Sequence, residues 1–369
     1  VYAAVRPVAT FIGAGLQRYR FGGENVRFIN ALALLSGNVG VAGGGAYFHL
    51  HSFRNLDLGW VRGPGHKGRR GLHIATIGKD ILAAQHPPVR LIWVNGINVV
   101  NQAPNALETA RAFEQVEFKV VVDAFMNDTA LRADLVLPCT LMLEQEDVIG
   151  SFLHEYVQVV SAVSPAPEGA RSDLWIVSEL GRRLDPPIVM PEAESCLRAA
   201  LRSAHIDTTL EELRQRRFVR SKRPRIPYEG LVFHHSDGRY RFPADLHAEP
   251  PPPEGYPLRL LTLIRRSAIH SQILPEDQAA PPAVWICPGN PALNGVDISR
   301  PVSLVSPLGR LPVTLDFEPG LHPAAVLYRR GDWMSQGGGA NQLIASGVTD
   351  IGGGAPFYEQ YVRLENNSG

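Results

Sequence analysis

Residues 91–137 contain three short apolar runs, and the pattern between them constrains the fold more than any other feature of the chain. The runs are Leu91–Val94, Phe118–Val122 and Asp134–Leu137, and apolar residues recur with helical spacing from Ala106 to Val116. Short strands that alternate with helices form a parallel sheet with crossover connections. The sequence therefore predicts an α/β fold.

Polar residues stand where these predicted strands end. Asn95 and Gly96 follow the first run, and Asp123 follows the second. Because ligands bind parallel sheets at the carboxyl ends of the strands, we expect these residues to lie at a binding edge. A helix from Ser172 to Leu184, with Ser172 as its N-cap, is expected to close this part of the chain.

The first 50 residues predict a strand, a turn, a helix and a glycine-rich loop. Ala9–Ile12 is extended, residues 25–35 have helical spacing, and Ser36-Gly37 is typical of a helix end. The glycines at 40 and 43–45 either let the backbone approach a large planar ligand or only supply turns with positive φ. Residues 51–88 predict a long loop that leads into a short helix near 77–85.

The later part of the chain predicts a connector and then a segment rich in strands. Residues 191–255 predict a connector with a charged helix, which a capping box from Thr208 to Glu211 begins. The run Pro250–Pro253 ends this connector. Regularly spaced strands follow, which is typical of a compact β-barrel. These strands are Leu258–Leu263, Ala283–Ile286, Val302–Val305, Leu311–Asp316, Ala324–Tyr328 and Gln360–Leu364.

Charge and cysteine content exclude several classes of partner. The 369 residues carry 36 basic and 36 acidic side chains, which gives no reason to expect nucleic acid or anionic lipid. No run approaches about 18 apolar residues and no signal-peptide pattern stands at the start, so we expect no membrane insertion by this chain. The 3 cysteines are scattered, without Cys-x-x-Cys spacing. This favours a reducing, cytoplasmic location and argues against an iron–sulfur cluster held by this chain alone.

Three segments carry a more specific pattern. The first runs from Asp123 to Pro138 as Asp-x-x-x-x-x-Thr-Ala-x-x-Ala-Asp-x-x-Leu-Pro, the second is the glycine-rich segment 36–45, and the third is Gly339-Ala-Asn341 with the residues after it. In content and order they resemble signature segments of the molybdopterin oxidoreductases, which hold molybdenum or tungsten between two pterin guanine dinucleotides. The resemblance covers nearly the whole chain and is weakest at 188–255.

The resemblance implies four parts. Residues 1–66 resemble the late part of a Rossmann-like α/β domain, and 67–190 resemble the second half of a second α/β cofactor-binding domain. Residues 191–255 are then the connector, and 256–369 resemble the C-terminal molybdopterin dinucleotide-binding β-barrel.

The resemblance also implies roles for single residues. Asp123 would accept hydrogen bonds from a guanine edge, supported by Thr129, although a polar strand end followed by a helix cap explains the same pair. Arg265, His270 and Ser271 would hold pyrophosphate. Arg266 is adjacent, so we expect only one of the two arginines to face the ligand. The implied cofactor-binding residues are Asn38, Gly40, Gly43, Gly45, Asn95, Gly96, Asn98, Asp123, Thr129, Asp134, Arg265, His270, Ser271, Asn341, which would contact a pterin, and Tyr358 in the closing strand.

Three residues are candidates for catalysis. His49, His51 and Arg54 follow the glycine-rich loop and would supply acid–base or substrate-anchoring groups near the metal, since histidine transfers protons near neutral pH. The alternative is a solvated loop with incidental histidines, and no residue is assigned as a metal ligand. A nicotinamide site at Gly13-Ala-Gly15 is disfavoured, because Arg18 replaces the third glycine and no acidic ribose partner follows.

The resemblance identifies the chain as the later part of an oxidoreductase catalytic subunit with two molybdopterin guanine dinucleotides and molybdenum or tungsten. Such an enzyme performs two-electron chemistry on a small substrate, formate being one candidate. The iron–sulfur cluster and the metal ligand from the protein would lie on an N-terminal part. This part is either a separate polypeptide, the expected partner, or the earlier portion of a longer enzyme of which these residues are a fragment. Further electron-transfer subunits would follow. The alternative is a cofactor-free structural subunit of a respiratory complex. The joint presence of Asp123, Thr129, His270, Ser271 and Asn341 favours a bound cofactor.

Overall fold

The computed structural model describes residues 2–61 and 69–367. Their contacts divide the chain into two compact units. The predicted boundary between residues 66 and 67 lies outside the described residues, and the other predicted boundaries stay predictions. Unit 1 comprises Val1–Gly13, Arg27–Arg70 and Leu137–Pro243, and unit 2 comprises Ala14–Val26, Gly71–Val136 and Ala244–Gly369.

Unit 1 contains one parallel and one antiparallel sheet. β1 (Ala9–Phe11) pairs in parallel with β2 (Gly45–Tyr47). In the other sheet, β7 (Tyr156–Val160) lies between β6 (Asp147–Ile149) and β8 (Phe218–Arg220). Its helices are α5 (Asp173–Arg182), α6 (Ala193–Ala200), α7 (Leu210–Arg216) and most of α1 (Gly22–Leu35), whose first turn belongs to unit 2.

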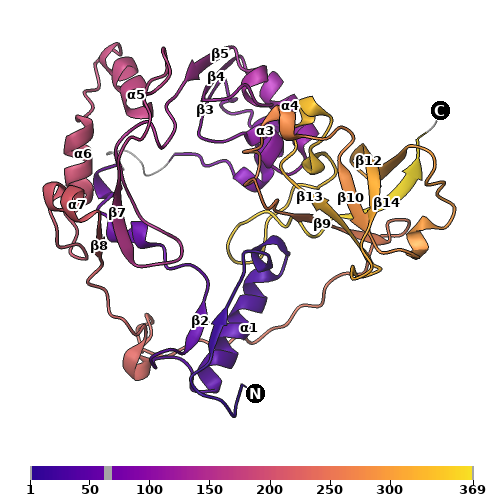
Figure 1. The fold of residues 1–369 in the computed structure, drawn as a ribbon, viewed down its shortest axis with the longest axis horizontal. Coiled ribbons are helices and arrows are strands. Elements are labelled where there is room, and N and C mark those ends of the chain that lie inside the picture. Colours follow the sequence, from indigo (N-terminus) through magenta and orange to yellow (C-terminus); the bar gives the residue numbers. More distant parts are fainter. Residues whose placement is uncertain (1, 62–68, 368–369) are drawn as a thin grey trace. The chain divides into compact units, whose positions relative to one another are not determined.

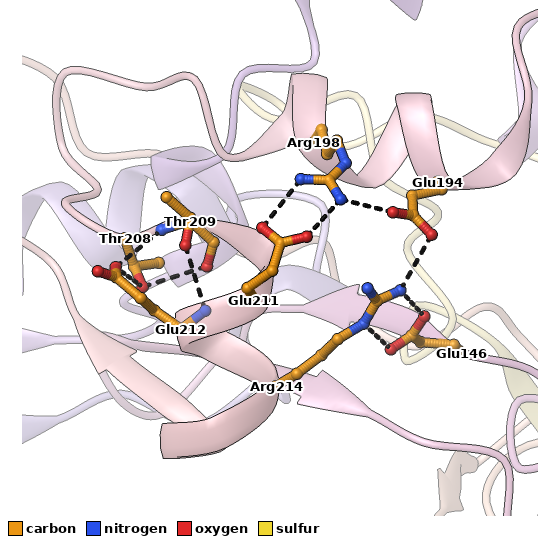
Figure 2. A network of polar contacts seen from close by, with 8 residues as sticks. All are labelled: Glu146, Glu194, Arg198, Thr208, Thr209, Glu211, Glu212 and Arg214. Atoms are coloured by element: carbon orange, nitrogen blue, oxygen red, sulfur yellow. Dashed lines mark hydrogen bonds and ion pairs between the residues drawn. The ribbon is translucent and has the colours of Figure 1, made fainter.

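An ion-pair network joins α6 and α7 to the residue before β6 (Figure 2). Arg214 of α7 donates from Nε and Nη2 to the two carboxylate oxygens of Glu146, at 2.8 and 2.6 Å. Arg198 of α6 pairs with Glu194 and Glu211. Leu197 of α6 and Leu210 of α7 pack in the same hydrophobic cluster of unit 1, so the network joins two helices that share a core.

The capping box of α7 lies one residue later than predicted. Thr209 accepts from the backbone N–H of Glu212 at 3.2 Å, and the Glu212 carboxylate accepts from the backbone N–H of Thr209 at 3.1 Å (Figure 2). The prediction from Thr208 to Glu211 was wrong because two consecutive threonines both fit the Thr-x-x-Glu spacing. By contrast, Ser172 caps α5 as predicted.

Unit 2 contains the predicted parallel sheet. β3 (Leu91–Asn95) and β4 (Phe118–Asp123) run in parallel with Asn95 opposite Val122, and β5 (Leu135–Pro138) follows at the other side of β4. This sheet packs with its helices around Val100, Phe113 and Val121, which are almost fully enclosed. The helices of this part are α2 (Ile77–Ala83), α3 (Val99–Gln102) and α4 (Ala106–Glu114).

A closed barrel completes unit 2, which confirms the predicted β-barrel (Figure 1). The strand order is β10-β12-β11-β14-β9-β13, so strands that are neighbours in the barrel are seldom neighbours in sequence. Alternate residues of β9 point inward, as its alternating burial shows. The strands are β9 (Leu258–Leu263), β10 (Ala283–Ile286), β11 (Val302–Ser306), β12 (Gly309–Phe317), β13 (Ala325–Arg329) and β14 (Tyr361–Asn366).

The fold is thus α/β with a C-terminal barrel, as the sequence predicts. In the part of the chain that the structure describes, the helices are all too short or too polar to cross a membrane.

Candidate cofactor-binding site

Unit 2 holds a cavity of about 260 Å³ whose walls come from stretches far apart in the sequence. Arg18 comes from the 3-10 turn Leu16–Arg18, and residues 101–104 come from the end of α3 and the loop after it. The barrel supplies His270 and Ser271 after β9, residues 330–332 after β13, and Asn341. The cavity therefore exists only where barrel loops meet the loop that leaves the parallel sheet.

Side-chain amides hold these walls together. Asn341 donates from Nδ2 to the backbone oxygens of Asn101 and Gln102, at 2.8 and 2.9 Å. Gln102 donates from Nε2 to the hydroxyl of Ser271 at 2.7 Å. Of the described groups, none donates to the Asn341 side-chain oxygen, so this acceptor stays available in the cavity wall.

Two buried carboxylates support the same walls from behind. Asp128, which is fully enclosed, accepts from Asn101 Nδ2 at 3.0 Å and from the backbone N–H groups of Met334 and Ser335, both at 2.8 Å. The loop after β4 is thereby joined to the loop after β13. Asn101 also donates to the backbone oxygen of Asp332 at 2.8 Å, which extends the network to the second carboxylate.

Asp332 pairs with Arg265, the side chain that was predicted to hold pyrophosphate. The Arg265 guanidinium forms an ion pair with one Asp332 oxygen, and the hydroxyl of Tyr328 donates to the other at 2.8 Å. Burial raises the pKa of Asp332, and these two partners oppose that rise. Arg265 is therefore committed to a structural pair, and its predicted contact with pyrophosphate stays a prediction.

Two other arginines face the cavity without a carboxylate. Among the described side chains, the ion pairs include neither Arg18 nor Arg330. Burial, and then the positive charge of Arg330, lowers the pKa of Arg18 to about 10. Burial also lowers the pKa of Arg330 and, together with the two arginines, that of His270. At neutral pH this wall is cationic, because both guanidinium groups stay protonated.

The predicted guanine contact lies elsewhere, at the edge of the parallel sheet. Asp123 ends β4, and Asn95 and Gly96 lie at the end of the neighbouring strand, as predicted. The Asp123 carboxylate accepts from the backbone N–H of Phe125 at 3.1 Å and from Asn127 Nδ2 at 2.8 Å. These bonds fix the carboxylate in a turn and leave it half-buried at the sheet edge.

Thr129 does not support Asp123 in the way predicted. Its fully enclosed hydroxyl donates to Asn98 Oδ1 at 2.8 Å and accepts from the backbone N–H of Val100 at 3.0 Å. Both hydrogen-bonding functions are thus used to hold the start of α3. The Nδ2 group of Asn98 is enclosed and has no partner among the described residues, so Asn98 keeps one unused donor.

Asp134 and Tyr358 make internal contacts. Asp134 pairs with the Lys119 ammonium at 2.8 Å and accepts from the Lys119 backbone N–H at 2.7 Å, which lowers the pKa of Asp134. Tyr358 is buried beside Tyr19, with ring centroids 5.4 Å apart. Of the barrel residues predicted for the cofactor, the 260 Å³ cavity brings together His270, Ser271 and Asn341.

The remaining predicted residues lie in unit 1. Gly40, Gly45 and His49 line a cavity of about 410 Å³ that is rich in aromatic side chains. Gly43 has a φ of 76° and lies in the same loop. Asn38 is enclosed and holds this loop, because its side-chain oxygen accepts from the backbone N–H of Val8 at 2.7 Å.

The catalytic candidates share the loop that follows β2. His51 has a φ of 48°, and its Nδ1 is enclosed with no partner among the described residues. Burial, followed by the charges of Arg54 and His49, lowers the pKa of His51. The ring centroids of His49 and His51 are 5.0 Å apart, whereas Arg54 is exposed. Across the described ranges, no group of three or more metal-binding side chains gathers.

Sequence reasoning missed Arg18, Arg330, Asn101 and Gln102. Asn101 and Gln102 follow the predicted ligand edge closely, so a polar pair at that place was an available signal. Arg18 stood out only as a departure from a glycine pattern. No local signal joins it to Arg330, because the two arginines meet only in the folded unit.

The comparisons with known proteins concern the family and the fold of the chain. A family model described as molybdopterin oxidoreductase matches residues 6–183. The probable oxidoreductase YyaE of Bacillus subtilis (strain 168) is 29% identical over 97% of this chain and 58% of its own length. Formate dehydrogenase H of Escherichia coli (strain K12) is 27% identical over 51% of this chain and 29% of its own length.

A solved structure shares the fold. Acetylene hydratase from Pelobacter acetylenicus matches 80% of this chain and 46% of its own with a TM-score of 0.64, at 17% identity. Two relatives match nearly all of this chain, and the chain spans about half of the length of each. Motif order, barrel topology and sequence relatives agree: the molybdopterin oxidoreductase family model matches residues 6–183, and the relatives that match nearly the whole chain are named as probable oxidoreductases.

Proposed function

We propose that this chain is the later, cofactor-binding part of a molybdenum or tungsten oxidoreductase that holds two pterin guanine dinucleotides. The match to the family model implies a molybdopterin-type cofactor. The guanine dinucleotide form and the number of copies are our proposal. One observation carries it: amide and hydroxyl groups and two unpaired arginines converge on a single cavity of about 260 Å³.

The described residues fit a large polar cofactor. The side-chain oxygen of Asn341 is an available acceptor, and Arg330 Nε is enclosed without a partner of its own. The wall between them also depends on a residue without a side chain, because a Cβ atom at Gly331 would lie 1.9 Å from the His270 backbone oxygen. A cofactor bound here would supply two-electron exchange with the substrate.

The residues of this chain would bind and orient that cofactor. Asn341 would hydrogen-bond the pterin portion, and Ser271 and the arginines of the same wall would hold the negative charge of the cofactor. Asp123 would accept from a guanine at the sheet edge, because its carboxylate is already fixed by Phe125 and Asn127. His49 and His51 stay candidates for proton transfer, and their contact with substrate is a proposal.

The rest of the enzyme would lie on an N-terminal part, on a partner polypeptide or on the same chain. The chain spans 58% of YyaE. Unit 1 also exposes large apolar side chains, with Phe11 at 83%, Leu153 at 78% and Leu35 at 73%. Exposed apolar patches of this kind are typical of partner surfaces. We propose that an N-terminal, iron–sulfur-bearing polypeptide covers them, and that electron-transfer subunits take electrons from it.

The location of the enzyme belongs to the same proposal. Cys139, Cys196 and Cys287 are not joined in disulfides, as a reducing compartment allows. We propose the cytoplasm. Without its partner, the chain is expected to carry no iron–sulfur cluster and to show no turnover, which metal analysis and activity assays of the purified chain test directly.

Cofactor content tests the proposed function. The chain is co-expressed with its native partner in a host that makes the cofactor, and metal, pterin and released guanine nucleotide are quantified. We expect molybdenum or tungsten with two guanine nucleotides per metal, and a clear loss of guanine nucleotide in Asp123→Ala. Asp277→Ala, at an exposed turn, is the matched control. A folded complex without pterin would instead indicate a structural subunit.

A further inference from the structure

Aromatic rings surround the cavity of about 410 Å³ in unit 1. Phe11 and Tyr47 stand opposite each other on β1 and β2, with ring centroids 5.8 Å apart. The ring of His49 lies against those of Phe48 and Phe152, with centroids 3.7 and 4.8 Å away. The parallel strand pair and the loops after β2 and β6 thus form one aromatic half of the wall.

The connector forms the other half. Tyr228 stacks on Phe233 with ring centroids 5.0 Å apart, and Phe233 meets the ring of Tyr240 edge-on at 5.4 Å. The connector can approach the glycine-rich loop because Gly40 has no side chain: a Cβ atom there would lie 2.7 Å from the Tyr228 backbone oxygen. Ring faces and edges on both sides favour an aromatic ligand, because aromatic rings attract one another in offset and edge-to-face contacts.

The wall is also uncharged in the part of the chain that the structure describes. None of the described residues that line this cavity is an aspartate, glutamate, lysine or arginine. An oxyanion such as formate or nitrate would lose its hydration here without gaining a cation, which costs free energy. The same cost applies to the phosphates of a dinucleotide. The wall therefore favours a neutral ligand, and a substrate rather than the charged part of the cofactor.

A few polar groups can orient a neutral ligand. The Tyr47 hydroxyl donates to the Gly44 backbone oxygen, and the Tyr240 hydroxyl donates to the Arg27 backbone oxygen at 3.3 Å. Because both hydroxyl hydrogens are used, each of these oxygens can still accept a hydrogen bond. His49 supplies the one imidazole among the described lining residues, and histidine transfers protons near neutral pH. A ring that carries one hydroxyl or N–H group matches this set.

The volume of the cavity limits the size of the ligand. Small-molecule pockets commonly measure about 300–1,000 Å³, and a cavity of about 150 Å³ already holds benzene. A volume of about 410 Å³ therefore accommodates one or two rings.

We infer that the cavity of unit 1 binds a neutral aromatic molecule of one or two rings, and that this molecule is the substrate of the enzyme. The inference rests on the proposed function, in which His49 is a candidate for proton transfer to the substrate. Phe11 and Leu153 line the cavity but are 83% and 78% exposed. The proposed N-terminal part would cover these two side chains from outside, while the ligand contacts the rings within.

Two probes of the same shape test the class of ligand. At neutral pH 4-methylphenol is neutral, whereas 4-methylbenzoate is an anion. The full chain is titrated with each probe, and binding is measured by calorimetry and by saturation-transfer NMR. We expect saturable binding of 4-methylphenol and binding of 4-methylbenzoate that is about tenfold weaker or more, because its carboxylate would be buried without a partner. Equal affinities, or displacement of 4-methylphenol by formate or nitrate, would contradict the inference.

Two substitutions locate the bound probe. Asn30 and Leu34 line the cavity one helical turn apart on α1, so Asn30→Trp should fill part of it. We expect Asn30→Trp to weaken 4-methylphenol binding about tenfold or more, and Leu32→Trp, at an exposed position of the same helix, to change it less than about twofold. Phe152→Ala removes a ring that is 54% exposed, so the chain should still fold, and binding should weaken about threefold or more. Phe317→Ala, at an exposed ring of the barrel, is its control. Unchanged affinity in both Asn30→Trp and Phe152→Ala would overturn the site.

The co-expressed complex tests whether the ligand is the substrate. There 4-methylphenol should bind as it binds the chain, and it should change the electron paramagnetic resonance spectrum of the partly reduced metal. Asn30→Trp should abolish this spectral change. Loss of binding in the complex would mean that the cofactor or the N-terminal part fills the cavity, which would overturn the inference. Binding without a spectral change would refute the assignment of the ligand as substrate.

Failure of this inference differs from failure of the proposed function. If the complex contains pterin guanine dinucleotide but neither it nor the chain binds 4-methylphenol, only the aromatic site is wrong. If 4-methylphenol binds the chain as expected but the complex never contains pterin, the cofactor assignment is wrong and the aromatic site stands.

Discussion

Replacing Asp128 with alanine should loosen the walls of the 260 Å³ cavity, although Asp128 does not line it. The carboxylate is fully enclosed and accepts from Asn101 Nδ2 at 3.0 Å and from the N–H groups of Met334 and Ser335 at 2.8 Å. In Asp128→Ala all three donors lose their acceptor. The loop after β4 and the loop after β13 then lose the carboxylate that joins them.

The size of the expected loss of stability depends on whether each of the three donors finds another acceptor. Ser335 is exposed and its N–H can bind water, and Asn101 Nδ2 still donates to the Asp332 backbone oxygen at 2.8 Å. Met334 is only half-buried but has no second acceptor among the described residues. With hydrogen bonds to a charged group at about 1.5–3 kcal/mol and partial rescue of two of them, we expect a loss of about 3–4 kcal/mol.

The assay combines urea unfolding with site-resolved hydrogen exchange, because two units need not unfold together. Asp128→Ala should raise the exchange rates of the Met334 and Ser335 amides, whereas Asp277→Ala should not. Asp128→Asn keeps the shape but turns an amide N–H toward a donor, so we expect about half the loss. A change below about 1 kcal/mol with unaltered exchange at 334 and 335 would refute this reasoning.

Two further predictions concern the same unit. The backbone N–H of His247 donates to one oxygen of Glu24 and the ring Nδ1 contacts the other, both at 2.7 Å. The contact with Glu24 raises the pKa of His247 and lowers that of Glu24, and the charges of Asp245 and Asp350 also act on the His247 ring. The stability that His247 contributes to this contact is complete below about pH 6.5 and is lost as pH rises through its raised pKa. The stability that Glu24 contributes is complete above about pH 4.5 and is lost as pH falls through its lowered pKa. Protection of the His247 amide from hydrogen exchange should therefore peak between these two pH values. His247→Gln should flatten the alkaline side, and an unchanged profile would contradict the assignment. Gly331→Ala should destabilise the chain, because its Cβ would meet the His270 oxygen at 1.9 Å with φ at 122°. Gly289→Ala, with φ at 73° and open space around it, should cost only about 1 kcal/mol, and equal effects of the two substitutions would contradict the role of the close approach.

Local patterns predicted the fold because each barrel strand can be recognised from its own sequence. β9 alternates buried and half-buried residues, and Pro, Gly and Asn separate the strands, so neither the strands nor their number needed long-range information. The capping box of α7 failed by one residue for a related reason: Thr208 and Thr209 offer the same local chemistry. Only the packing of α7 decides between them.

The site was less predictable, because its key contacts join distant segments. Asp123 was placed at a strand end by a purely local rule. Arg265 was predicted to be a phosphate ligand, but the structure pairs it with Asp332, and Arg18 was noted only as a departure from a glycine pattern, although it lies beside Arg330. Whether an arginine lacks a carboxylate is a property of the folded unit.

The strand order of the barrel also determines when a cofactor can enter. β14 lies between β11 and β9, so the barrel stays open at two strand edges until the ribosome has made residues 361–366. Open edges in a nascent chain invite pairing with other chains. Ala355 and Phe357, which line the cavity, immediately precede this strand. The wall that Ala355 and Phe357 form would therefore be complete only after the barrel has been synthesised, and the proposed cofactor would enter the cavity after that step.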